Sequence, residues 1–190
     1  MTAATSPLVE SKQRIAIRRL GLWLFIASES CLFLGILIAR YYMQGLHRPA
    51  EVNQILGLAI TIILLTSSFF ANRAEVSISR GDQPAFLRHL LVTIGLGVLF
   101  LVGVVVFEWP EALHFAPPST GYGTALFSLT GLHAFHVLTG VIVLVVVYLQ
   151  GRRGHYSAEN HWDVEGGVVY WHFVDVAWVV IYPTLYLVGS

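Results

Sequence analysis

Long apolar runs alternate with short polar connectors along the whole chain. A helix of about 20 residues crosses the hydrocarbon core of a bilayer, and a spanning segment is helical because the bilayer interior offers its backbone no water. The pattern therefore predicts an all-α protein, a polytopic transmembrane helix bundle of five spans. The five runs that are long enough lie at about 20–42, 52–71, 86–107, 123–149 and 167–188.

The runs follow one another as a single unit. We expect residues 1–19 to form a cytoplasmic tail and residues 20–190 to form one five-helix transmembrane domain. The polar start of the chain and the length of the first run predict a membrane span there, not a cleavable signal peptide. Glycine and proline mark the connectors, and Pro110 is expected to lie in the connector after the third run.

Basic residues predict the orientation of the bundle. Lys and Arg gather on the cytoplasmic side of membrane proteins. Of the 11 in this chain, only Arg40 and Arg48 fall on the side of the first connector. We therefore expect a cytoplasmic N-terminus and an external C-terminus. The remaining nine lie in the N-terminal tail and in the second and fourth connectors: Lys12, Arg14, Arg18, Arg19, Arg73, Arg80, Arg88, Arg152 and Arg153.

Composition agrees with a membrane protein and excludes other classes. Charged residues make up 12% of the chain and the formal net charge is zero, whereas soluble chains carry roughly 25% charged residues. A chain without a basic face does not bind nucleic acid. No nucleotide-binding loop, activated nucleophile pair or HExxH helix occurs in the sequence. We therefore expect no catalytic centre and no metal site in this chain.

One run carries a regular polar stripe. Thr61, Ser68, Asn72 and Glu75 recur at helical spacing in and beyond the second run, which places them on one helix face. We expect this helix to continue to about Ser79 and the stripe to face protein, not lipid.

Ionisable residues inside the spans are the candidate functional residues, because they are costly in a bilayer and seldom face lipid. Three interpretations compete: haem ligation by His133 or His136 together with His172, proton conduction through Glu29, and buried hydrogen-bonded pairs that hold helices together or line a lipid cleft. The residues are Glu29, Glu108, His133, His136, His172 and Asp175.

At these residues the chain resembles subunit III of the haem-copper respiratory oxidases, the cytochrome c and quinol oxidases, over nearly all of residues 20–190. The similar segments are FIASE (Phe25–Glu29), RGD (Arg80–Asp82), FEW (Phe107–Trp109), FSLTGLHAFHVLTG (Phe127–Gly140) and YWHFVDVAW (Tyr170–Trp178). The longer members of the family have seven helices, and this chain resembles a short, five-helix form without the first two. In the longer form those two helices make one wall of a lipid-filled cleft.

The resemblance implies a non-catalytic subunit of a proton-pumping terminal oxidase. Haem and copper are then expected in the partner subunits and not in this chain. The expected partners are subunit I, in direct contact, and subunit II with other subunits of the complex. Bound phospholipid, support of proton uptake and protection of the active site are implied as well, in the cell (plasma) membrane of a bacterium.

The resemblance also implies what the candidate residues do. It makes them buried polar or lipid-binding groups, with Arg152 able to meet a lipid phosphate. The alternatives are an accessory subunit of a nitric oxide reductase and a membrane cytochrome b. The implied residues are Glu29, His133, His136, Arg152, His172 and Asp175.

Overall fold

The computed structural model of the chain describes residues 7–45 and 48–189. Residues 1–6 of the predicted cytoplasmic tail lie outside the described residues, and the rest of that tail belongs to the first helix. The elements are α1 (Pro7–Gln44), α2 (Gln54–Ser79), α3 (Gln83–Val102), the π-helical turn η1 (Gly103–Glu108), α4 (Trp109–Phe115), α5 (Gly121–Arg152), α6 (Trp162–Tyr182) and the π-helical turn η2 (Pro183–Leu187).

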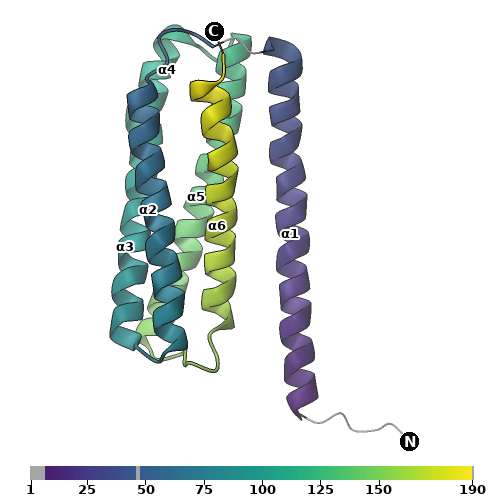
Figure 1. Cartoon of the computed structure of the whole chain (residues 1–190), viewed down its shortest axis with the longest axis vertical. Coiled ribbons are helices and arrows are strands. Elements are labelled where there is room, and N and C mark those ends of the chain that lie inside the picture. The colour runs from purple at the N-terminus through teal and green to yellow at the C-terminus, as the bar shows by residue number, and fades with distance from the viewer. Residues whose placement is uncertain (1–6, 46–47, 190) are drawn as a thin grey trace, which may run out of the picture.

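The described residues confirm the predicted all-α fold with five spans. Five helical segments are long and apolar enough to cross a membrane: Gln13–Tyr42, Gln54–Ser79, Gln83–Phe115, Gly121–Arg152 and Trp162–Leu187. They run side by side as one bundle, and α1 begins at the end opposite to the one where the chain stops (Figure 1). The predicted extension of the second span is present, because α2 continues to Ser79.

The third span passes through Pro110 instead of ending before it. A proline in a helix lacks an N–H and its ring clashes with the carbonyl four residues earlier. Here the turn before it, Gly103–Glu108, widens into a π-helix, and α4 follows without a break. A π-helical turn re-satisfies backbone groups that a proline would leave free. This local widening explains why a helix continues where we expected a connector.

The helices α2, α3, α5 and α6 form a compact four-helix unit (Figure 1). Two indoles of α6 fill its centre, since Trp171 and Trp178 are both fully buried. Their N–H groups donate to α2, Trp171 to Ser67 Oγ and Trp178 to Thr61 Oγ1, each at 2.9 Å. These bonds give the buried indoles polar partners inside an apolar core.

Helix α1 stands to one side of that unit (Figure 1) and has its main contacts with α5 and α6. It buries few side chains, among them Ile26, Phe33 and Leu37. Near its C-terminal end the guanidinium of Arg40 lies 5.6 Å from the centre of the Tyr122 ring of α5. Because α1 touches its neighbours at only a few positions, space remains between it and the bundle.

Candidate functional site

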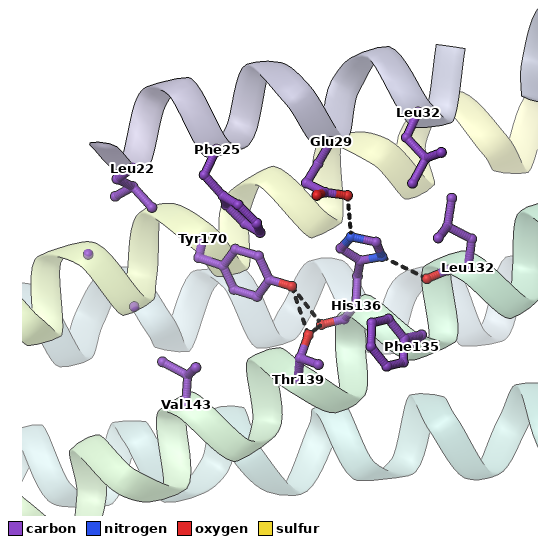
Figure 2. A pocket seen from close by; sticks show the side chains of 12 residues that line it. Leu22, Phe25, Glu29, Leu32, Leu132, Phe135, His136, Thr139, Val143 and Tyr170 are labelled. Atoms are coloured by element: carbon purple, nitrogen blue, oxygen red, sulfur yellow. Dashed lines mark hydrogen bonds and ion pairs between the residues drawn. The ribbon is translucent and has the colours of Figure 1, made fainter. Parts of the chain in front are cut away.

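Two cavities of the described residues lie between α1 and the pair α5 and α6. A cavity of about 510 Å³ is open on one side and is walled mainly by apolar side chains. Leu22, Phe25, Glu29 and Leu32 contribute from α1, and His136 is the ionisable residue that contributes from α5. Figure 2 shows these α1 side chains pointing toward α5 and α6. We call this space the groove.

Glu29 and His136 meet across the groove. Glu29 Oε2 lies 3.1 Å from His136 Nε2, and His136 Nδ1 lies 2.8 Å from the carbonyl oxygen of Leu132 (Figure 2). A carbonyl oxygen only accepts, so Nδ1 carries a hydrogen. The Nε2–Oε2 contact then holds one further proton, either on Glu29 with a neutral imidazole or on His136 with a carboxylate. In both forms the pair has no net charge.

A hydroxyl network fixes the same wall of the groove. Thr139 Oγ1 donates to the carbonyl oxygen of His136 at 2.9 Å, and the Tyr170 hydroxyl lies 2.8 Å from Thr139 Oγ1 and 3.3 Å from that carbonyl oxygen. The ring of Phe25 from α1 lies 6.0 Å from that of Tyr170. Tyr170 therefore links α6 to the α5 turn that holds His136, which positions the histidine toward Glu29.

The groove continues to the predicted cytoplasmic end of the bundle. A second cavity, of about 520 Å³, shares Leu22, Val143 and two glycines with the first. Its other end meets a third space of about 260 Å³ at the loop between α5 and α6. That space has a mostly polar lining, and we call it the mouth of the groove. It is lined by Arg18, His155, Tyr156, Asn160, Trp162 and Asp163.

Charged contacts join α1 to α6 beside the mouth. Arg19 donates to Glu165 Oε1 at 2.7 Å and its guanidinium lies 5.4 Å from the centre of the Trp162 ring. Arg18 lies farther from Asp163, at 4.0 Å, and both side chains are more than half exposed. The arginine that lines the mouth is thus the less strongly held of the two.

Tyr156 forms the inner side of the mouth. Its hydroxyl donates to Gln150 Oε1 at 2.7 Å. Burial raises the pKa of this phenol to about 12, and the nearby Asp163 carboxylate acts in the same direction. The hydroxyl therefore stays protonated and remains a hydrogen-bond donor throughout the physiological pH range.

The other predicted histidines lie apart from this pair. His133 is fully buried, with its ring 4.7 Å from that of Trp178 and Nε2 3.1 Å from the Val174 carbonyl oxygen. His172 Nδ1 lies 3.0 Å from Ser68 Oγ on α2. Each of the three histidines thus has a contact of its own. In the part of the chain that the structure describes, no three His, Cys, Asp or Glu side chains gather as a metal site would require.

The remaining predicted residues lie outside the groove. Asp175 is 4% exposed, and neither carboxylate oxygen has a hydrogen-bond partner among the described residues. Arg152 is exposed in the last turn of α5 and is absent from the lining of the groove and its mouth. Glu108 is buried at the other end of the bundle, where the Tyr186 hydroxyl donates to it.

The sequence did not single out Arg18, Thr139 or Tyr170. Arg18 counted only as one of the nine basic residues of the cytoplasmic side, and Tyr170 only as part of a resembling segment. The one available signal was spacing: Thr139 follows His136 by three residues and therefore lies on the same helix face.

Comparison with known proteins gives one consistent family. The family described as "Cytochrome c oxidase subunit III" matches residues 11–190. The chain is 32% identical to cytochrome c oxidase subunit 3 of Thermostichus vulcanus, over 90% of this chain and 87% of that protein. The protein of the same name from Synechocystis sp. is 32% identical, over 90% and 76%. That of Hippopotamus amphibius is 33% identical, over 90% and 70%.

Proposed function

Because this chain belongs to the cytochrome c oxidase subunit III family, we propose that it is a non-catalytic subunit that holds a phospholipid in the groove between α1 and the pair α5 and α6. As a member of this family it is a subunit of a multisubunit terminal oxidase, and neither the nitric oxide reductase nor the cytochrome b alternative is favoured. Direct packing against subunit I, with haem and copper in partner subunits, is part of the proposal.

The observation that carries the lipid proposal is the change of polarity along the groove. Its deep part is apolar at bilayer depth, while its mouth is polar and lies at the end of the bundle that the charge pattern places in the cytoplasm. An amphiphile with long chains fits such a space because its tails cover apolar walls and its head group stays among polar side chains. The two cavities together run from Leu32 to Arg18, two positions 14 residues apart on α1, or about 21 Å at 1.5 Å per residue.

The Glu29–His136 pair suits an apolar ligand. A charged group at this depth would oppose burial of lipid tails. The two side chains share one proton and have no net charge in either arrangement. We propose that the pair ties α1 to α5 and so keeps the wall of the groove in place.

Arg18 is the basic side chain best placed for the lipid phosphate. It lines the mouth, and its own ion pair with Asp163 is long and exposed, so its guanidinium is available for a charge-assisted hydrogen bond. Arg152, expected from sequence to meet a phosphate, is exposed on α5 and its role stays a prediction.

The lipid proposal is tested on the intact oxidase, purified in mild detergent and analysed by native mass spectrometry. Arg18→Gln should lower the fraction of complexes that retain a phospholipid several-fold, whereas the matched change Arg152→Gln should leave it as in the wild type. The exposed Arg18–Asp163 pair contributes little stability, so the complex should still assemble. Lipid loss with Arg152→Gln alone, or full retention in both variants, would contradict the proposal.

Co-purification tests the larger assignment. An affinity tag on this chain should recover subunits I and II, and haem should follow them and be absent from the separated chain. Support of proton uptake, protection of the active site and a place in a bacterial plasma membrane stay predictions. So does the orientation, for which a reporter fused after Ser190 should read as external.

A further inference from the structure

The outward surfaces of the bundle differ in polarity at bilayer depth. On the third span, the exposed side chains between Leu91 and Phe107 are all apolar. On the other side, α2 and α6 form a seam whose surface includes polar side chains. It comprises Ser68, Asn72 and Glu75 of α2 together with Glu165 and His172 of α6, and we call it the α2–α6 seam.

His172 is the ionisable residue of the seam that lies deepest in the bilayer. It follows Trp162, the first residue of α6, by ten residues, which places it about 15 Å along the helix and near the middle of a hydrocarbon core of about 30 Å. Its side chain is partly exposed. It therefore faces outward at the depth where a polar group is most costly.

One ring nitrogen of His172 lacks a partner. Nδ1 lies 3.0 Å from Ser68 Oγ, and Nε2 has no hydrogen-bond partner within residues 7–45 and 48–189. If Ser68 donates to Nδ1, Nε2 carries the hydrogen and needs an acceptor. If Nδ1 donates to Ser68, Nε2 needs a donor. Either tautomer leaves an unmet hydrogen bond toward the outside.

A neighbouring side chain has the same deficit. Asp175 lies three residues further along α6, so it shares a helix face with His172. It is buried, and both of its carboxylate oxygens lack a partner among the described residues. Asp175 is enclosed by the bundle itself, so the group that lipid tails would touch is His172, and an unmet polar group is costly there because lipid tails cannot form hydrogen bonds.

We propose that the α2–α6 seam is an interface covered by a transmembrane helix of another oxidase subunit, and that this helix offers a hydroxyl, amide or carboxyl side chain to His172. These groups both donate and accept, so they satisfy either tautomer of the imidazole. Helix association in membranes uses such polar contacts. This inference rests on the proposed function, because it requires a multisubunit complex, and it assigns the apolar face of α3 to lipid.

A photo-activated cross-linker tests the surface without altering His172. Benzoylphenylalanine is placed at Val176, which is 63% exposed and one turn from His172 on the seam, or at Val98, which is 44% exposed on the apolar face of α3. The two sites are matched, since each valine lies 14 or 15 residues into its span. In the intact oxidase, Val176 should give a covalent adduct with another subunit at a yield several-fold above that of Val98.

The remaining outcomes are separable. Adducts only from Val98, adducts of Val176 only with lipid or with a second copy of this chain, and adducts from neither position would each overturn the proposed interface. If one of these cross-linking results is obtained while the oxidase subunits co-purify with this chain, the proposed function stands and only the interface is wrong. If no oxidase subunit co-purifies with the wild type, both proposals fail together.

A pair of substitutions tests the role of His172 itself. His172→Leu should increase the fraction of oxidase that loses this chain in detergent, and His172→Gln should restore retention because its amide forms the missing hydrogen bond. Ser68→Ala is the control, since it removes the internal contact and leaves Nε2 in place. Equal loss in all three variants would show a purely internal role for His172 and overturn this part of the proposal.

Discussion

The first helix and the four-helix unit are built on different principles. In the most apolar stretch of α1, 17% of the residues are buried inside the molecule, compared with 50% for the last span. Indoles that pack against glycines and hydroxyl groups fill the centre of the four-helix unit. Helix α1 is attached to this unit by a few polar and aromatic contacts, and the groove lies between α1 and the unit. The comparison indicates that the four-helix unit is the tightly packed scaffold, and that α1 is the less buried part that encloses the groove.

Removing one indole from each region should show the largest difference. Trp171 is fully buried in the four-helix unit, whereas Trp23 of α1 is 60% exposed. Trp171→Ala should lower stability by about 3–5 kcal/mol because it leaves a cavity and removes the hydrogen bond that Ser67 Oγ accepts from the indole. Trp23→Ala should change it by less than about 0.5 kcal/mol. Thermal unfolding of the purified complex, monitored as dissociation of this subunit, measures the stability of both variants. Equal losses of stability in the two variants would contradict the comparison.

Two glycines of α3 sharpen the same contrast within one helix. A Cβ at Gly97 would lie 2.6 Å from Cη2 of Trp171, whereas a Cβ at Gly95 would meet no atom within 4 Å. Gly97→Leu should therefore cost stability toward the upper end of about 1–3 kcal/mol through overpacking, and Gly95→Leu should be nearly neutral. The same dissociation measurement applies, and a tolerant Gly97 would mean that the unit is less tightly packed than the structure shows.

Glu29 tests the attachment of α1. Glu29→Gln keeps a donor for His136 Nε2, so haem content and the first seconds of turnover should stay close to wild type. Glu29→Leu leaves that nitrogen without a partner and should cost roughly 1–3 kcal/mol, less than Gly97→Leu because Glu29 is partly exposed. Oxygen consumption and retention of α1 contacts by cross-linking are the readouts. Immediate loss of turnover in Glu29→Gln, with normal haem and assembly, would instead place Glu29 on a proton path.

The smallest effect is expected at the N-terminal end of α1. The Arg19–Glu165 pair is short, at 2.7 Å, but the side chains are 55% and 29% exposed. Arg19→Gln should lower the stability of the α1 attachment by less than about 1 kcal/mol, and added salt should reduce the difference from wild type because it screens exposed charges. Melting curves at low and high salt check this; a loss independent of salt would indicate packing against Trp162 as the main contribution.

The five spans could be predicted from the sequence because the hydropathy of a segment of about 20 residues depends on no tertiary contact. It also placed Glu29, His133 and His136 at bilayer depth as candidates for buried hydrogen-bonded pairs. The structure selects His136, a choice that depends on the rotation of α1 about its axis. The hydrophobic pattern of α1 could not fix that rotation, since apolar residues surround the helix on all sides.

Other features depended on shape that the sequence does not display. Gly95 and Gly103 stand two turns apart and look like one packing face, yet only Gly103 meets a neighbour closely, at Ile60, and Gly97 meets Trp171. The third helix continues through Pro110 because of a π-helical turn, and the hydrophobic pattern around Pro110 does not predict such a turn. The mouth at Arg18 required the loop after α5 to fold back toward α1.

The separation in sequence between α1 and its partners sets an order of assembly. Glu29 and His136 are 107 residues apart, and Arg19 and Glu165 are 146 apart. During synthesis α1 enters the bilayer before α5 and α6, the helices that hold it, have been made. Meanwhile α2 and α3, joined by a short turn, can pair at once. We therefore expect α1 to remain unpacked in the bilayer until α5 and α6 have been inserted, and to pack against them in the final step. A lipid that then lies along α5 and α6 would be enclosed in the groove.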